Sequence, residues 1–173
     1  MFVLDTNVVS TFRKATPHPA VTPWIAQTGW QAIATTVITI IELQRGVERA
    51  RVQHPHVADN VERWLTGLLA AGTPQVLPMG VMAARLLARM HETPALRHFV
   101  LTDPQAKEQA TGADLAIAAI AITAGAAVAT GNAKHFLQIN AWFPLPGLFD
   151  PMAQAWHISA PVGVMTRGRQ LRL

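Results

Sequence analysis

The sequence predicts an α/β fold in which a central parallel β-sheet of about four to five strands is flanked by α-helices. Two observations lead to this prediction. Short apolar runs of strand length alternate with longer segments whose apolar residues recur at helical spacing. The first run, at residues 2–4, ends in Asp5, Thr6 and Asn7, and polar residues of this kind are typical of the ligand-binding edge of a parallel sheet.

Composition narrows the class of protein. A chain of 173 residues is one domain by length, and a hydrophobic content of 50% allows a sizeable core. Only 14% of residues are charged, which hints at surface covered by a partner, and the net charge of +4 permits binding to a polyanion. The absence of cysteine excludes disulfides and thiolate metal sites. The longest uncharged apolar stretch is shorter than the roughly 20 residues of a membrane span, and no basic leader precedes the first strand, so we expect a cytoplasmic protein.

The elements of the N-terminal half follow from periodicity and from helix breakers. After the first strand we expect a short helix over residues 8–14, with Thr6 or Asn7 as its N-cap. A proline-rich loop then leads into a brief helix around Trp24. The further elements expected here are a strand at 32–36, a helix at 37–51, a break at 54–56 and a helix at 58–71. The side chains expected on the buried sides of these two helices include Ile38, Ile41, Val47, Val61, Trp64, Leu65, Leu68 and Leu69.

The C-terminal half contains the most apolar helix of the chain. We expect it at residues 113–124, where Gly125 ends it. The other elements expected are a strand at 75–77, a helix at 80–92 packed through Met82, Leu86 and Met90, a long loop at 93–109, a strand at 126–129 and a helix at 133–137. Beyond residue 139 the chain is rich in proline, glycine and tryptophan, and we expect the tail at 166–173 to be frayed.

Three of the ten acidic residues stand in apolar surroundings: Asp5, Glu42 and Asp114. Each has an ordinary structural explanation. Asp5 can start a turn or cap a helix. Glu42 can lie on an exposed helix stripe near Arg45 and Arg49. Asp114 in the first turn of a helix is favoured by the helix dipole by roughly 0.3–1 kcal/mol.

Taken together, these acids predict a metal site. All three fall near ends of elements that a parallel sheet brings to one edge, and carboxylates held close together disfavour each other's ionisation. A divalent cation with a preference for oxygen ligands, Mg²⁺ or Mn²⁺, removes that penalty. Such a site suits hydrolysis of a phosphodiester bond by a metal-activated water. The sequence has no Ser-His-Asp pattern, glycine-rich phosphate loop or HExxH motif that would support another chemistry.

Four segments in order resemble the PIN domain, and in particular the VapC-type toxins of bacterial toxin–antitoxin pairs. They are Val-Leu-Asp-Thr-Asn-Val-Val-Ser at 3–10, Thr-Val-Ile-Thr-Ile-Ile-Glu-Leu-Gln-Arg-Gly-Val at 36–47, Gly-Ala-Asp-Leu-Ala-Ile-Ala-Ala-Ile-Ala at 112–121 and Ala-Thr-Gly-Asn-Ala-Lys-His-Phe at 129–136. The resemblance covers about residues 1–150, which we take as a PIN domain, and leaves 151–173 as a C-terminal extension that we expect to be partly flexible.

The resemblance implies a ribonuclease that depends on Mg²⁺ or Mn²⁺ and hydrolyses RNA as the toxin of such a pair. It also implies a homodimer and a small DNA-binding, VapB-like antitoxin as partner. The residues that it assigns to the metal are Asp5, Glu42 and Asp114. For the dimer and antitoxin interfaces we expect apolar residues of the early helices, such as Val8, Phe12 and Trp64.

Other residues of the family pattern surround these acids. Thr6, Asn7 and Thr130 would orient the acids or a water molecule, and Asn132 completes the expected catalytic set. The family often has an acid at the position of Asn132 and commonly an Asp at that of His135. These two departures leave open whether the site takes one metal ion or two.

Alternative interpretations remain at this stage. The chain could be a catalytically silent PIN-fold module that acts through protein or RNA interfaces. It could also be a metal-dependent phosphatase of another α/β family, although those usually have a second Asp at the position of Asn7. The seven histidines show no zinc-ligand spacing. Arg45, Arg49 and Arg51 form either a solvated helix face or part of an RNA path.

Overall fold

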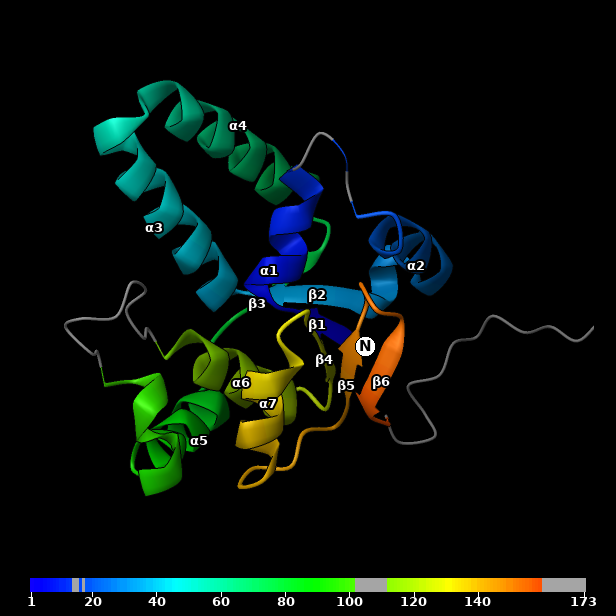
Figure 1. Cartoon of the computed structure of the whole chain (residues 1–173), viewed down its shortest axis with the longest axis vertical. Helices are drawn as coiled ribbons and strands as arrows, with labels where there is room; N and C mark the ends of the chain where they lie inside the picture. The colour runs from blue at the N-terminus through cyan, green and yellow to red at the C-terminus, as the bar shows by residue number, and fades with distance from the viewer. Residues whose placement is uncertain (14–15, 17, 102–111, 160–173) are drawn as a thin grey trace, which may run out of the picture.

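A computed structural model describes residues 1–13, 16, 18–101 and 112–159 of the chain. A six-stranded sheet in the order β3-β2-β1-β4-β5-β6 lies at its centre (Figure 1). The strands are β1 (Phe2–Leu4), β2 (Ile33–Thr36), β3 (Gln75–Leu77), β4 (Ala127–Ala129), β5 (Leu148–Asp150) and β6 (Ala155–Ile158). Neighbouring strands are parallel except that β6 runs antiparallel to β5. The predicted α/β fold with a mainly parallel sheet is confirmed, with slightly more strands than expected.

Helices cover both faces of this sheet. They are α1 (Thr6–Val9), α2 (Val21–Thr28), α3 (Val37–Gln53), α4 (Pro55–Ala71), α5 (Val81–His91), α6 (Ala113–Thr123) and α7 (Ala133–Asn140), with the short 3₁₀ helices η1 (Ser10–Arg13), η2 (Trp30–Ala32) and η3 (Pro94–Phe99). No helix within the described residues is long and apolar enough to cross a membrane.

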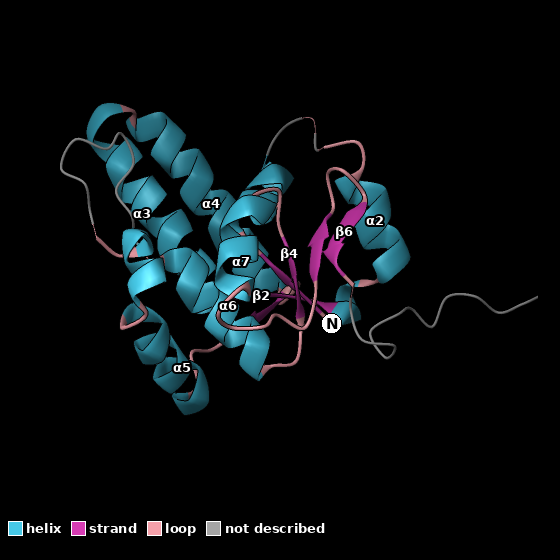
Figure 2. Cartoon of the chain, turned by 60° about the horizontal axis from the view of Figure 1, so that its bottom comes forward, coloured by secondary structure: helices cyan, strands magenta, loops and turns pink. Residues whose placement is uncertain are grey.

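The alternation of side chains along β1 divides the core in two. Phe2 and Leu4 point to one face, where they pack with residues of α1, α2 and α4. Val3 points to the other face, into a larger core built around α5, α6 and α7. Figure 2 shows α6 and α7 over that face. Because α6 lies in the middle of this layer, its apolar residues are buried nearly all round the helix.

Strand register places the polar ends of β1 and β4 side by side. Leu4 pairs with Ala129 in parallel register, so the residues that follow them, Asp5 and Thr130, emerge at the same edge. The Asp5 backbone N–H donates to the Ala129 carbonyl over 3.0 Å and extends the ladder to this edge. The predicted juxtaposition of the strand at 126–129 with the first strand is therefore confirmed.

The longest helices, α3 and α4, form an antiparallel pair that extends away from the sheet. Figures 1 and 2 both show this pair at the opposite end of the molecule from α2 and β6. The break expected at 54–56 is only one residue long: His54 separates the helices and Pro55 already begins α4. Proline is tolerated at this first position because its missing N–H would have no partner there.

Several predicted burial positions are wrong. Ile41, Leu69 and Met82 are 52%, 45% and 65% exposed, whereas all three were expected in the core. Val8 was expected at an interface but is fully buried inside the chain, so it is not available to a partner. Phe12 and Trp64, the other expected interface residues, are partly buried against the same internal core.

Two local features near the ends of the chain differ in part from the prediction. The N-cap of α1 is Asp5, which was one of the ordinary explanations offered for this residue, and not Thr6 or Asn7. Strands β5 and β6 were not expected, and β6 extends the sheet to Ile158, beyond the residue 150 at which we placed the end of the PIN domain. The excursion expected at 93–109 begins with η3, and its remainder from residue 102 lies outside the described residues, as does the tail from residue 160.

Candidate active site

Asp5 is the central side chain of the polar edge. It directly follows β1 and is only 4% exposed. Its Oδ1 accepts a hydrogen bond from the Thr6 backbone N–H over 2.6 Å. Its Oδ2 accepts from Asn7 Nδ2 over 2.6 Å and from Thr130 Oγ1 over 2.7 Å. The ordinary role of helix cap and a central place in the site therefore belong to the same residue.

The surroundings of Asp5 oppose its ionisation. Burial raises the pKa of Asp5 to about 7, the hydrogen bond from Thr130 works against this rise, and the carboxylates of Asp114 and Glu42 add to it. The two other acids are therefore close enough to act on Asp5, although they come from residues far away in the sequence. A cation beside Asp5 would favour its ionised form.

Glu42 reaches the site from the second turn of α3. Its Oε2 accepts a hydrogen bond from Thr6 Oγ1 over 2.5 Å. Thr36 caps α3 through a 3.2 Å bond from the Thr39 N–H to its Oγ1, and Thr39 Oγ1 lies 3.3 Å from Thr6 Oγ1. This short row of threonines joins the start of α3 to the start of α1, so it fixes where Glu42 stands relative to Asp5.

Asp114 reaches the site from the first turn of α6, where it pairs with His135 of α7. His135 Nδ1 lies 2.7 Å from Asp114 Oδ2 and 2.9 Å from Asn132 Nδ2. One ring nitrogen cannot donate and accept at once, and an ionised carboxylate can only accept. Pairing with ionised Asp114 therefore requires a proton on Nδ1, which leaves that nitrogen unable to accept from the Asn132 amide.

The loop after β4 closes the network. Asn7 Nδ2 donates to Thr130 Oγ1 over 3.0 Å, the Gly131 N–H donates to Asn7 Oδ1 over 3.1 Å, and the Asn132 N–H donates to Thr130 Oγ1 over 2.8 Å. A Cβ atom at Gly131 would stand 2.9 Å from Met152 Sδ, too close for an undisturbed contact. The Met152 side chain, from the turn after β5, therefore packs directly onto this loop.

The structure thus brings all the predicted site residues to one edge of the sheet. Hydrogen bonds link Asp5 to Asn7 and to Thr130, which is joined to Asn132, and they link Asp5 through Thr6 to Glu42. Asp114 pairs with His135, whose Nδ1 also lies 2.9 Å from the Asn132 amide. We call the acids Asp5, Glu42 and Asp114 the acidic centre. Sequence reasoning did not assign roles to Thr39 or His135. Their helical spacing of three residues from Glu42 and Asn132 was the available signal.

The donor set of this edge fits a hard divalent cation that keeps part of its water shell. The side chains offer carboxylate, amide and hydroxyl oxygens, which Mg²⁺ and Mn²⁺ prefer. No three His, Cys, Asp or Glu side chains among the described residues are grouped closely enough to form a ready-made cage. Mg²⁺ usually takes only one or two carboxylates directly, so the absence of a cage within this part of the chain is compatible with such a site.

The chain belongs to the PIN domain family, whose profile matches residues 2–140. Among curated proteins it is similar to ribonuclease VapC14 of Mycobacterium tuberculosis (strain CDC 1551 / Oshkosh), with 36% identity over 63 residues. That match covers 36% of this chain and 61% of the relative, which is less than two thirds of the relative's length.

Two solved structures show the same fold. FitAcB from Neisseria gonorrhoeae has a TM-score of 0.57 at 25% identity, and the match covers 87% of this chain and 98% of that chain. VapBC2 from Rickettsia felis, bound to a DNA fragment from the promoter, has a TM-score of 0.54 at 18% identity, with 79% and 91% covered.

Proposed function

We propose that this chain is a metal-dependent endoribonuclease and the toxin of a toxin–antitoxin pair. The observation that carries the proposal is the state of Asp5, a buried carboxyl whose pKa is raised to about 7 partly by Asp114 and Glu42. Asp114 and Glu42 disfavour the ionisation of Asp5 at this sheet edge, and a bound cation would favour the ionised form. Membership of the PIN family and the likeness to a protein named a ribonuclease support RNA as the substrate.

In this proposal Mg²⁺ or Mn²⁺ is held mainly by Asp5 and Asp114, with Glu42 acting partly through water. The bound cation would polarise the scissile phosphate and lower the pKa of the attacking water. The chain's own residues prepare this arrangement. Thr130 and Asn7 hold the Asp5 carboxylate in one orientation, and Thr6 connects Glu42 to the helix that Asp5 caps.

Asn132 sets the charge of the proposed site. Its amide oxygen can accept from a metal-bound water or bind a hard cation, but it adds no negative charge. The acidic centre therefore carries at most three negative charges from Asp5, Glu42 and Asp114. That is enough for one divalent ion, whereas a second ion about 4 Å away would be repelled until substrate phosphate arrives. We expect one tightly held ion in the free protein.

The proposed partners are an antitoxin and a second copy of the chain. The solved structures of similar fold are of FitAcB and of VapBC2, the latter on promoter DNA, and they support a DNA-binding, VapB-like antitoxin for this chain. An arginine of such a partner could pair with the acidic centre and replace the cation there. Excess antitoxin should then abolish cleavage.

A catalytically silent PIN module is the second candidate function. It is favoured by the fact that both oxygens of Asp5 already accept hydrogen bonds from Thr6, Asn7 and Thr130. Under this alternative the acids only stabilise the sheet edge, and the chain acts through its surface. A nuclease would cleave RNA in an assay, whereas a catalytically silent module would leave it intact.

The proposal is tested by incubating the purified chain with labelled single-stranded RNA in Mg²⁺, in Mn²⁺ and in EDTA. We expect cleavage with either ion and none in EDTA. Asp114→Asn should abolish cleavage while the protein still melts cooperatively. Glu92→Gln, which removes an exposed carboxyl at the end of α5, should cleave like wild type. Full activity of Asp114→Asn would refute the proposed role of the acidic centre.

A further inference from the structure

We propose that Arg45 and Arg49 of α3 bind successive backbone phosphates of the RNA and lead the strand away from the acidic centre. This inference rests on the proposed ribonuclease function and adds to it a binding path on a named helix face. Its basis is a contrast among the three arginines of α3 and a shallow hollow on this helix that includes Arg45, about one helical turn beyond Glu42.

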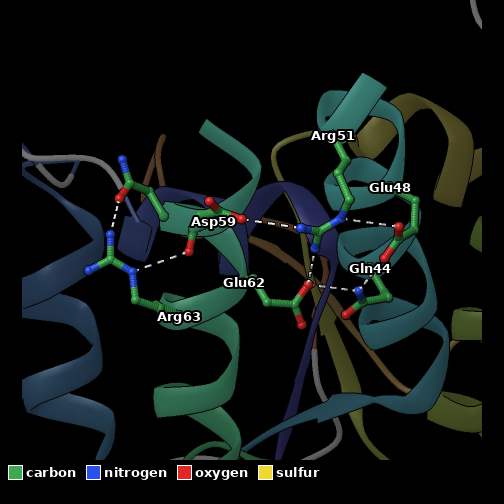
Figure 3. A network of polar contacts seen from close by, with 7 residues as sticks. Gln44, Glu48, Arg51, Asp59, Glu62 and Arg63 are labelled. Atoms are coloured by element: carbon green, nitrogen blue, oxygen red, sulfur yellow. Dashed lines mark hydrogen bonds and ion pairs between the residues drawn. The ribbon is translucent and has the colours of Figure 1, made fainter. Parts of the chain in front are cut away.

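Arg51, the third arginine of α3, is fully engaged within the protein. Its guanidinium pairs with Glu48 at 3.5 Å, with Asp59 at 3.2 Å and with Glu62 at 3.0 Å, which ties α3 to α4 (Figure 3). Arg45 and Arg49 make no such ion pair or hydrogen bond with any described part of the chain, and both are exposed. Two of the three arginines are thus available to an external anion.

The nearest acid on the same helix does not cancel these charges. Glu48 Oε1 accepts a 2.9 Å hydrogen bond from Gln44 Nε2, and its Oε2 faces Arg51. Gln44 is itself held by a 3.0 Å bond to Glu62 of α4. Figure 3 shows this network directing the Glu48 carboxylate toward Arg51. Arg45 and Arg49 therefore keep their positive charge on the open side of the helix.

The two arginines line a shallow, open hollow on one face of α3 together with Ile41, Gln44 and Glu48. Ile41 is 52% exposed and directly precedes Glu42, whose carboxylate bonds to Thr6 in the acidic centre. Arg45, which lines the hollow, lies about one helical turn beyond Glu42 on the same helix. In the proposed complex the exposed side chain of Ile41 offers an apolar surface to a ribose or base, while the two guanidinium groups face the phosphates of the RNA backbone.

Helix geometry places the arginines at a suitable spacing. Glu42, Arg45 and Arg49 follow at positions i, i+3 and i+7, which fall on one stripe of an α-helix. At 1.5 Å per residue, Arg45 lies ~4.5 Å and Arg49 ~10.5 Å beyond Glu42 along the axis. The ~6 Å between the arginines corresponds to about one to two nucleotides of a stacked strand, at ~3.4 Å each.

RNA fits this surface better than a protein partner does. A protein would have to supply two correctly spaced carboxylates as well as an apolar side chain for Ile41. A nucleic-acid strand supplies a phosphate at every step, and the planar guanidinium fork matches phosphate oxygens. The arginine surface also lies on the helix that carries Glu42 of the acidic centre, which is proposed to act on a phosphate. One RNA strand could therefore occupy the acidic centre and the arginine surface together.

The test measures binding of a short fluorescein-labelled single-stranded RNA by anisotropy in EDTA, over a series of salt concentrations. Wild type is compared with Arg45→Gln, Arg49→Gln and the double variant. Each lost phosphate contact should lower the slope of log affinity against log salt by about 0.7 for a single strand, or about 1.4 for the double variant. In Mg²⁺ the double variant should show a raised KM and a nearly unchanged kcat.

The matched control is Arg85→Gln with Arg97→Gln, which removes the same charge from α5 and η3 outside the hollow. It should keep the wild-type slope. If the arginine variants of α3 also keep that slope while wild type binds and cleaves RNA, the inference is wrong and the proposed function stands. If the α3 arginine variants keep the wild-type salt slope but lose a dimer that wild type forms in light scattering, the two arginines belong to an interface between copies and the inference is overturned. If wild type neither binds nor cleaves RNA, both proposals fail.

Discussion

Replacing Asp5 by asparagine should change how the stability of the protein depends on pH. In the folded chain the pKa of Asp5 is raised from 3.8 to about 7. Between these values the folded state holds a proton that the unfolded state has released, so the free energy of unfolding falls as pH rises. Stability from this group is present at low pH and is lost as pH rises toward 7.

The size of the effect follows from the shift. About three pH units at about 1.4 kcal/mol each give a loss of about 4 kcal/mol across the whole window. Between pH 5 and pH 7.5, where both proteins can be measured, the free energy of unfolding of wild type should fall by roughly 2.5 kcal/mol more than that of Asp5→Asn. Asp5→Asn has no carboxyl to ionise, so it should lack this part of the decline. The other titrating groups are common to both proteins and cancel in the comparison.

The assay is urea unfolding of wild type and Asp5→Asn in EDTA at several pH values, with the free energy extrapolated to water. Glu92→Gln controls for the loss of a carboxyl at the surface. Adding Mg²⁺ above pH 7 should stabilise wild type, by about 2.7 kcal/mol at 100 times Kd, but not Asp5→Asn. Parallel pH profiles for wild type and Asp5→Asn would show that Asp5 is not the buried acid described here.

Three further substitutions test the surroundings of the acidic centre. Asn132→Asp should tighten Mn²⁺ binding in calorimetry because it adds a carboxylate beside the cation, and unchanged affinity would mean that Asn132 does not face the centre. His135→Ala removes the 2.7 Å contact to Asp114 and should slow RNA cleavage about tenfold, since such a bond contributes about 1–1.5 kcal/mol. Wild-type rates would exclude an orienting role. Gly131→Ala should lower the melting temperature only slightly, because the added Cβ meets the flexible end of the Met152 side chain, which can shift. Met152→Ala in the same chain should restore part of that loss, and no coupling between the two changes would contradict the close packing.

Local signals were strong enough to predict the centre of the fold. Val3 and Leu4 are apolar and lead directly into Asp5, and the uncharged run around Asp114 is unmistakable as a buried helix. The carboxyl ends of neighbouring parallel strands lie at the same edge of a sheet, so the proximity of Asp5 and Thr130 followed from topology alone. These inferences needed only neighbouring residues and a general rule of α/β folds.

Contacts that form only in the assembled fold could not be predicted from the sequence. β5 has only three residues, and it forms a strand because β4 offers it a partner. Ile41 looked like a core residue by helical spacing, yet it is 52% exposed in the folded chain. The contact of His135 with Asp114 joins two helices across 21 residues, which no local spacing encodes. Asp5 caps α1, as its ordinary structural explanation predicted, and this does not conflict with its proposed role at the metal.

The central claim is that Asp5, Glu42 and Asp114 act together on one cation to cleave RNA. It is tested most directly by titrating Mn²⁺ calorimetrically into wild type, Asp5→Asn, Glu42→Gln and Asp114→Asn, and by measuring RNA cleavage in the same samples. We expect one tight site in wild type, weaker binding in Glu42→Gln, none measurable in the two aspartate variants, and loss of cleavage in all three. A variant that remains folded, binds Mn²⁺ as wild type does and cleaves RNA at the wild-type rate would contradict the claim.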